Sequence, residues 1–404
     1  MSDDLIQLAH VTTPRIIKVI GVGGGGGNAV AQMYRDNIPE VRYLVANSDK
    51  KALEDNPVPD HLQLGPGLGA GGNPEIGREL ALGSVELIAK ALDDETKMVF
   101  ITAGMGGGTG TGASPVIAHE ARKKGILTIG IVTIPFLFER EKQIDKALDG
   151  LEALSKEVDA MLVINNERLC DIYPDLSIIN AFKRADETLS TAVSSITEII
   201  SMHGRVNLDF QDVCTALRNG GVAVMSSGYG EGEERVSKAI YDALNSPLLN
   251  NNDVFRAQHI LLAITTSDSG ENGLLTSEMN EVTDFMSKFN ANIETKWGLA
   301  FDPELGKKIK ITIIASGFGL YGDAKQAAPQ QMMSEEEAIE REEQRNKYYG
   351  ATRNKRTRKR PRIYLFTEDD LCNFEVISEV ESVPTYKRTA EYLHNIKQLS
   401  KTNN

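Results

Sequence analysis

Short hydrophobic runs alternate with helical stretches over roughly residues 16–134. The runs "IIKVIGV", "VRYLVAN", "KMVFITA" and "ILTIGIVTI" are each long enough for one buried strand, and "EIGRELALGSVELIAKAL" between them has a helical pattern. Strands that alternate with helices predict a parallel sheet with helices on both faces. The run "DAMLVINNERL" adds a further strand. The first part of the chain is therefore predicted to be an α/β domain.

One long helix is predicted over residues 178–203. Its apolar positions recur at three- and four-residue spacing, so that one face should be buried along its whole length. These positions are Ile178, Phe182, Ala185, Leu189, Ala192, Ile196 and Ile199. At 1.5 Å per residue the helix would span ~39 Å, about the diameter of a domain.

A second, smaller α/β domain is predicted after this helix. Its strands are "GVAVMSSG", "HILLAITTS", "NIETKWGLAF" and "KIKITIIASGF", and two helical stretches lie between them. Beyond Tyr321 an acidic run, "SEEEAIEREEQRNK", and a basic run, "RNKRTRKRPR", replace the apolar pattern, which is typical of a disordered linker. The predicted organisation is a flexible segment at 1–15, a nucleotide-binding domain at 16–177, the central helix at 178–203, the second domain at 204–320, a disordered linker at 321–380 and a terminal peptide at 381–404.

Charge and cysteine content exclude some classes of partner. A formal net charge of −13 over 404 residues argues against a protein that coats nucleic-acid phosphates, so no nucleic acid is required. Three cysteines lie far apart without zinc spacing, so no metal site built from protein ligands alone is predicted.

The N-terminus lacks a secretory pattern, and no apolar run approaches the ~18 residues of a membrane span. We expect a cytoplasmic protein without direct membrane insertion.

Two glycine-rich loops follow predicted strands. Gly21, Gly23 and Gly26 fit G-x-G-x-x-G, with Asp49 at the distance of a ribose-binding acid, which is the pattern of an NAD-dependent oxidoreductase. Such an enzyme has no use for "GGGTGTG" after a later strand, however, and two loops on neighbouring strands indicate a chain of phosphates. No G-x-x-x-x-G-K-[ST] occurs. Backbone amides, a metal ion and the Thr109 and Thr111 hydroxyls are then left to bind the phosphates.

Six ordered motifs resemble those of the tubulin and FtsZ superfamily, and within it the FtsZ family of bacterial cell-division GTPases. They are "GVGGGGGNAV", "GAGGNPEIG", "AGMGGGTGTGASP", "PFLFE", "AFKRADETL" and "NLDFQDV", and the similarity runs from about Ile16 to Leu320. The resemblance implies a GTPase that polymerises head to tail and forms the division ring at mid-cell. It also implies GTP, GDP and Mg²⁺ as ligands.

The resemblance assigns a role to individual residues. Glu139 matches the ribose contact, and Asn166 matches a base or ribose contact. Phe182 matches the ring that stacks on guanine, and Asp186 matches the acid that accepts hydrogen bonds from the base's N–H groups. The plainer readings are a core phenylalanine for Phe182 and a surface aspartate for Asp186. The remaining nucleotide-binding positions are Gly23, Gly24, Gly25, Gly26, Asn28, Gly69, Ala70, Gly71, Gly72, Gly106, Gly107, Gly108, Thr109, Gly110, Thr111 and Gln143. Residues 69–77 are similar to the loop that senses the γ-phosphate.

The chain departs from the family pattern beside this site. The family usually has "FEGxxR", whereas this chain has "FERxxQ", with Arg140 in place of the glycine and Gln143 in place of the arginine. A glutamine supplies no cation to a phosphate. Either Arg140 reaches the nucleotide from its own position or the affinity is lower. Asn165 also stands where a proline is common.

The acids of "NLDFQDV" lie beyond the far end of the long helix. Asp209 and Asp212 match the family's catalytic acids and Asn207 the residue that orders their loop; alternatively, Asp209 only caps the following helix. A straight helix would place these acids ~35 Å or more from the phosphates that the same chain binds. An adjacent subunit is then needed to complete the site.

The terminal segment is predicted to bind partner proteins, and two other classes of function remain possible for the chain. "ESVPTYKRTAEYL" at 381–393 resembles, in diverged form, the family's tail peptide, which binds membrane-tethering and regulatory division proteins. An NAD-dependent oxidoreductase and a nucleotide-sensing filament protein that does not hydrolyse GTP remain as alternatives.

Overall fold

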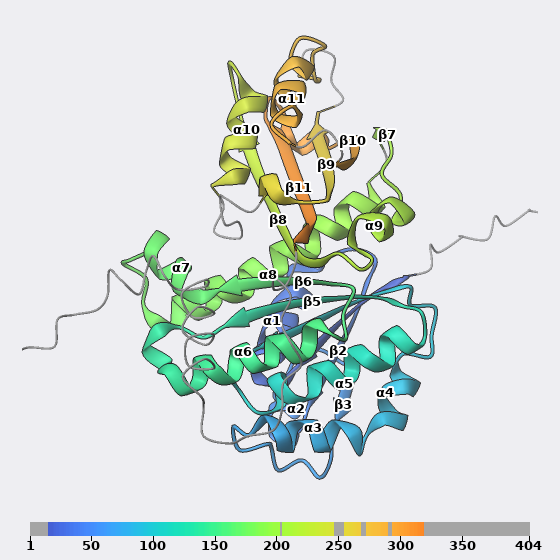
Figure 1. Cartoon of the computed structure of the whole chain (residues 1–404), viewed down its shortest axis with the longest axis vertical. Helices are drawn as coiled ribbons and strands as arrows, with labels where there is room; N and C mark the ends of the chain where they lie inside the picture. Colours follow the sequence, from blue (N-terminus) through green and yellow to red (C-terminus); the bar gives the residue numbers. More distant parts are fainter. Residues whose placement is uncertain (1–14, 203, 246–253, 268–271, 290–292, 319–404) are drawn as a thin grey trace, which may run out of the picture. The chain divides into compact units, whose positions relative to one another are not determined.

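The computed structural model describes residues 15–202, 204–245, 254–267, 272–289 and 293–318. All of them belong to one compact unit within residues 1–352 (Figure 1). The expectations for the N-terminal segment, the linker at 321–380 and the peptide at 381–404 lie outside the described residues, save for Arg15. The domain boundaries remain a prediction.

A single sheet of eleven strands runs through the described residues, in the order β3-β2-β1-β4-β5-β6-β8-β11-β9-β10-β7. Its first six strands are parallel throughout, as the alternation of strands and helices predicts. They are β3 (His61–Gln63), β2 (Val41–Asn47), β1 (Ile17–Val22), β4 (Met98–Gly104), β5 (Leu127–Ile134) and β6 (Ala160–Asn165). The carboxyl ends of these strands therefore meet at one edge.

Helices connect these strands and cover them. They are α1 (Gly23–Asp36), α2 (Lys50–Glu54), α3 (Pro74–Leu82), α4 (Val85–Ala91), α5 (Thr109–Lys123), α6 (Glu141–Ser155) and α7 (Asn166–Ile172). The pattern at 75–92 predicted one helix, but two are found, with a break at Gly83 and Ser84. The Ser84 hydroxyl donates to Leu80 O and accepts from Gly65 N. A serine that bonds nearby backbone in this way competes with the helix, which explains the break.

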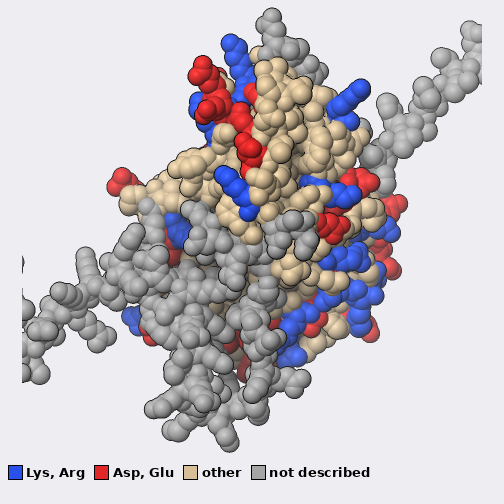
Figure 2. Space-filling model, turned by 45° about the horizontal axis from the view of Figure 1, so that its top comes forward, with Lys and Arg blue, Asp and Glu red and all other residues tan. Residues whose placement is uncertain are grey.

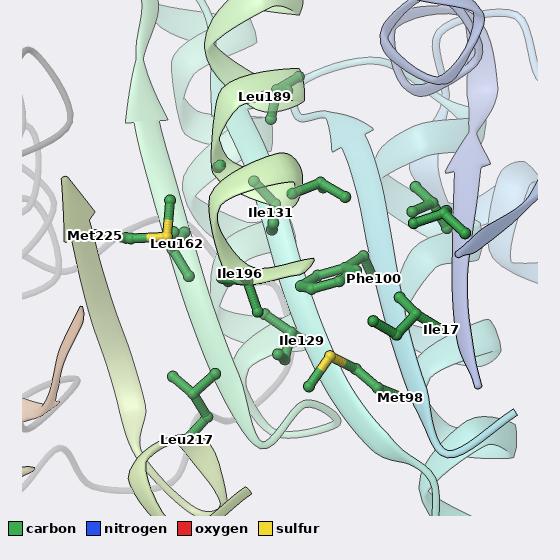
Figure 3. Packing of buried hydrophobic residues seen from close by; sticks show 14 of the residues in the cluster. Ile17, Met98, Phe100, Ile129, Ile131, Leu162, Leu189, Ile196, Leu217 and Met225 are labelled. Carbon is green, nitrogen blue, oxygen red and sulfur yellow. The ribbon is translucent and has the colours of Figure 1, made fainter. Parts of the chain in front are cut away.

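The long helix α8 (Ile178–Ser201) is confirmed and ends two residues before the predicted position. Its Leu189 and Ile196 pack in the main hydrophobic cluster with Ile131 and Phe100 of the sheet (Figure 3). Burial along its whole length is wrong for the first turn, because Ile178 is 63% and Phe182 43% exposed. The α8 residues of the main apolar cluster begin at Leu189, and the Phe182 ring meets the Phe136 ring in a T-shaped contact. The buried face begins at Ala181.

The second half of the sheet is mixed. Its strands are β8 (Gly221–Gly230), β11 (Ile309–Phe318), β9 (His259–Thr266), β10 (Glu294–Phe301) and β7 (Gly204–Val206), accompanied by α9 (Phe210–Leu217), α10 (Arg235–Leu244), α11 (Met279–Met286) and the short turns η2 (Val254–Arg256) and η3 (Pro303–Leu305). β11 is antiparallel to both of its neighbours, and β10 is parallel to β9. α10 and α11 pack over this half in a separate apolar cluster.

The two halves of the sheet join through a short ladder. β6 and β8 pair at Ala160 with Gly221 and at Met161 with Val222. Residues from both halves, including Leu217 and Met225, pack with α8 in one cluster (Figure 3). α8 is thus the element around which the two halves share a core.

The surface of the described part carries charges of both signs. In the view of Figure 2, Lys and Arg side chains are interspersed with Asp and Glu. Among the described helices, none has the length and apolar character needed to cross a bilayer.

Candidate functional site

Two glycine loops at the carboxyl edge of the sheet pack backbone against backbone. We call residues 22–28, where β1 ends and α1 begins, the first loop, and residues 102–111, where β4 ends and α5 begins, the second loop. A Cβ on Gly26 would overlap Thr102 O, and a Cβ on Gly23 would lie 2.7 Å from Gly110 N. Any side chain at these two positions would push the loops apart. The glycines therefore bring the starts of α1 and α5 together.

The starts of α1 and α5 have the properties of an anion site. Neither N-cap, Val22 or Gly108, makes a side-chain cap, and neither first turn holds an acid. By contrast, Asn73 caps α3 and Asp49 caps α2. The first N–H groups of an uncapped helix lack partners, and the helix dipole places positive potential there. Two such ends side by side suit a chain of phosphates.

A third loop, residues 69–73, lies against the second loop. A Cβ on Gly108 would lie 2.9 Å from both Ala70 Cβ and Asn73 N. Gly69, Gly71 and Gly72 have φ of 78°, 57° and 71°, in the left-handed region that favours glycine. No neighbouring atom of the described residues would meet a Cβ at these three positions. Backbone conformation alone thus requires glycine in the third loop.

Both candidate threonines of the second loop have partners inside the protein. The Thr109 and Ser48 hydroxyls lie 2.6 Å apart, and Thr111 Oγ1 accepts from Gly106 N at 2.9 Å. These bonds fix the loop's shape. Of the remaining predicted phosphate contacts, Gly24, Gly25 and Asn28 are exposed at the mouth of the first loop, and Gly107 is half-buried in the second.

An aromatic cluster lies beside these loops, after β5. The buried Phe136 stacks with Phe138 and meets the Phe182 ring edge-on, each at 5.0 Å between centroids. Phe182 is 43% exposed, so part of its side chain stays available for a base. Asp186 lies one turn further along α8, and burial, aided by the charge of Glu187, raises its pKa to about 7. Asp186 is half-buried, which differs from the plainer reading of a solvated surface acid.

Two polar side chains border the aromatic cluster. Glu139 ends the short turn η1 (Leu137–Glu139); its carboxylate accepts from Phe136 N at 3.0 Å, and burial raises its pKa. Asn166, which begins α7 directly after β6, is 5% exposed, and its side-chain oxygen has no hydrogen-bond partner among the described residues. A buried unpaired oxygen is costly unless a ligand satisfies it. Asn166 thus fits a nucleotide contact.

Sequence reasoning missed a supporting acid. Glu167 is fully buried and accepts from Leu137 N at 2.8 Å, so that it holds the turn that carries Glu139. The available signal was a carboxylate two residues after a buried strand. An acid buried at such a position needs a hydrogen-bond donor from the protein.

The departures at 140 and 143 differ in their structural consequences. Arg140 has φ 76° and ψ 157°, a region that is essentially restricted to glycine, and its side chain is exposed. Gln143 is half-buried, and its Cγ would lie 3.2 Å from a Cβ on Gly106. Gln143 therefore lies on the second loop, whereas Arg140 shows no ion pair with any described residue.

The predicted catalytic acids are not brought to the glycine loops. Asp209 caps α9 and forms a reciprocal capping box with Asp212, as one reading of the sequence anticipated. Asp212 also pairs with Lys296 of β10 at 3.2 Å. Burial alone would raise the pKa of Asp212, but the Asp209 N–H and Lys296 together lower it. Asn207 accepts from Gly204 N at 2.8 Å and so orders this loop. Ser201, the last residue of α8, lies 19 positions after Phe182, so ~29 Å of helix at 1.5 Å per residue separates the loop of Asn207 from the aromatic cluster.

Comparison with protein families finds three matches along the chain. Residues 16–174 match the Tubulin/FtsZ family GTPase domain, residues 221–319 the FtsZ family C-terminal domain, and residues 358–403 a further FtsZ C-terminal family. The last match lies outside the described residues.

Curated and solved relatives agree with these matches. "Cell division protein FtsZ" of Porphyromonas gingivalis is 46% identical over 98% of this chain and 91% of its own length, and that of Aquifex aeolicus is 42% identical over 77% and 85%. The solved structure "FtsZ dimer, empty" from M. jannaschii has a TM-score of 0.67 at 37% identity, over 74% of this chain and 88% of that one. CetZ1 from Haloferax volcanii, at 20% identity and a TM-score of 0.65, shares the fold.

We predict that guanine nucleotide binding weakens as the pH falls. If Asp186 recognises the base, only its ionised form would accept from both N–H groups, so affinity for GDP should drop about tenfold between pH 8 and pH 6 for a pKa near 7. Calorimetric titration of wild type and Asp186→Asn measures this. Ionisation of the ligand is common to both proteins, so the ratio of their affinities isolates Asp186. A ratio that stays constant with pH would contradict the assignment.

We also predict that Arg140→Gly stabilises the protein. The observed backbone conformation costs a non-glycine residue ~1–3 kcal/mol, and the entropy that glycine loses on folding offsets ~0.5–1 kcal/mol of the gain. A net gain of about 1 kcal/mol should appear as a higher urea midpoint. Arg140→Ala is the control, because it removes the side chain but keeps the strain. Equal midpoints for the two variants would show that the strain is absent.

Proposed function

The chain belongs to the FtsZ family, and from this premise we propose that it binds GTP, assembles head to tail into filaments of the division ring, and hydrolyses GTP between subunits. The observation that carries the proposal is the pair of uncapped helix starts, α1 and α5, brought together by bare glycine backbone. Such a pocket binds successive phosphates without a lysine in the loop.

The nucleotide would extend from these loops to the aromatic cluster. Its phosphates would accept from the N–H groups of the first and second loops, and its guanine would lie on the exposed face of Phe182. Asp186 would accept from the base, and Glu139 from the ribose hydroxyls. The unpaired Asn166 oxygen would accept from the base or the ribose. Recognition by an acceptor-only carboxylate favours guanine over adenine, because adenine presents no N1–H.

Mg²⁺ would complete the phosphate site. The described residues contain no group of three or more His, Cys, Asp or Glu side chains placed to hold a metal. Mg²⁺ needs only one or two protein ligands when a nucleotide's phosphates supply others, so it would be held chiefly by the nucleotide. The ion would neutralise charge that develops on the phosphates during hydrolysis.

The site for hydrolysis would be shared between subunits. Asp209 and Asp212 would polarise the attacking water on the GTP of the next molecule, with Asn207 holding their loop. A contact between two different faces that does not close generates a filament. Self-association is supported by the solved relative titled "FtsZ dimer" and by CetZ2 of Haloferax volcanii, which is titled a GTPγS-bound protofilament.

The alternatives have less support. For an NAD-dependent oxidoreductase, Asp49 would be the ribose acid, but its carboxylate caps α2 by accepting from Lys51 N and Ala52 N. A filament protein that senses nucleotide without hydrolysis would leave Asp209 and Asp212 with capping roles alone. Mixing Asp212→Ala with Gly108→Val separates that possibility from the proposal.

The terminal segment would link the filament to its partners. The family match at 358–403 supports a conserved terminal unit and is longer than the predicted peptide at 381–404. We assign this unit to the binding of membrane-tethering and regulatory division proteins, which would place the cytoplasmic filament at mid-cell.

Mixing two inactive variants should restore hydrolysis. Asp212→Ala removes an acid from the face that carries Asp209 and Asp212, and Gly108→Val blocks the phosphate site on the face that carries the glycine loops. A Cβ at position 108 would already lie 2.9 Å from Asn73 N. Each variant alone should be nearly inactive. In an equal mixture about a quarter of the junctions combine two good faces, so about a quarter of wild-type phosphate release should return.

Two controls accompany the mixing experiment. Phe182→Ala replaces Gly108→Val if the latter does not fold, because Phe182 is partly exposed. Excess chelator should stop hydrolysis if Mg²⁺ is required. Absence of recovery in a mixture that co-sediments as polymer would contradict the shared site, as would full specific activity in dilute monomer.

Truncation after Gly319 should separate assembly from localisation. GTP hydrolysis and sedimentation of polymer should stay near wild type, because every residue assigned to the nucleotide and to the acids precedes this point. A fluorescent fusion should lose its mid-cell ring. Truncation after Val380 tests the terminal peptide by itself. Normal rings from the shorter chain would refute the tail's role.

A further inference from the structure

A lysine of α6 holds the backbone of the third loop. Lys146 Nζ donates to Gly72 O at 2.7 Å, although the two residues are 74 positions apart in the chain. Lys146 has no counterpart among the nucleotide contacts that the sequence predicted. It lies one helical turn after Gln143, on the same side of α6.

The same helix lies against the second loop. Gln143 O would be 2.9 Å from a Cβ on Gly106, and a Cβ on Gly150 would have Thr111 within overlap distance. α6 begins at Glu141, two residues after Glu139, the predicted ribose contact. One rigid helix therefore touches the second loop and, through Lys146, the third loop.

The third loop is anchored at its two ends and open between them. Gly69 N donates to Ser48 O at 2.8 Å, Asn73 N donates to Ala70 O at 3.0 Å, and the Asn73 side chain caps α3. Gly71 and Gly72 have open space at their Cβ positions and the conformational freedom of glycine. A hydrogen bond to Gly72 O restrains the part of the loop that would otherwise sample most conformations.

The contact also brings charge to a site that lacks it. The first and second loops contain no basic residue, and Gln143 is neutral. Lys146 places an ammonium on the third loop, one turn from the position where the family usually carries an arginine. The other charged side chains on this stretch of α6 are Glu141, Lys142, Asp145 and Asp149.

We propose that Lys146 is a positioning residue that holds the third loop closed over the γ-phosphate and so makes this chain distinguish GTP from GDP. The inference rests on the proposed function. GDP has no γ-phosphate, so closure of the third loop contributes to the binding of GTP alone. Lys146 thereby compensates for the neutral residue at 143.

The experiment compares Lys146→Met with Lys142→Met in the full-length protein. Lys142 is an exposed lysine of the same helix, and methionine keeps the length of the side chain while removing its charge and donors. Titration with a slowly hydrolysed GTP analogue and with GDP, both with Mg²⁺, should show an ~10-fold loss of affinity for the analogue in Lys146→Met and less than a twofold change for GDP. Lys142→Met should match wild type. Lys146→Arg retains donors and should recover most of the loss.

Hydrogen exchange of the nucleotide-free protein gives an independent measurement. Amides of residues 69–73 should exchange faster in Lys146→Met than in Lys142→Met. Equal losses for both nucleotides would overturn the proposal in favour of a general supporting role, and unchanged affinities with unchanged exchange would overturn it as an idle contact. Failure of the proposed function is distinguishable, because wild type would then bind neither guanine nucleotide while the exchange difference could persist.

Discussion

Close contact between the backbones of the first and second loops is the constraint on which the candidate site depends. β1 and β4 are adjacent, and α1 and α5 start at their carboxyl ends, so their N-termini converge only if nothing projects between them. Gly26 against Thr102 O and Gly23 against Gly110 N provide that proximity. The absence of caps then leaves the N–H groups of both helices available. The positive potential of the pocket therefore results from the absence of side chains at the glycines and of side-chain caps at the two helix starts.

The opposite end of α8 is organised by side chains instead. Leu208 packs over Gly298 of β10, Lys296 of the same strand pairs with Asp212, and the capping box binds Asp209 to Asp212. The acids are thus oriented before any partner arrives, and α8 separates them from the nucleotide of their own chain. Under the proposed shared site, a single subunit would hold halves of two different sites, and a filament is the arrangement that would bring complementary halves together.

The sequence allowed the parallel sheet, the long helix and the glycine loops to be predicted, because hydrophobic period and loop composition are local properties. Errors arose where a tertiary contact decides the outcome. The Ser84 hydroxyl, at the break in the stretch 75–92, accepts from Gly65 N, 19 positions away, and Ile178 at the start of α8 is exposed because the apolar cluster ends before it. Glu167 and Lys146 were missed because their partners, Leu137 N and Gly72 O, are 30 and 74 positions away. The domain boundaries and the roles of the site residues stay predictions.

The ladder of two residue pairs between β6 and β8 has a mechanical consequence. Two rungs of a ladder contribute only ~1 kcal/mol each, so tension between the halves of the subunit is not carried chiefly by the sheet. The covalent path instead runs along α8, whose 24 residues hold their own hydrogen bonds and whose apolar face is clamped in a core shared by both halves. A filament under strain would therefore transmit pulling force through this helix, with the β6–β8 junction as the compliant joint.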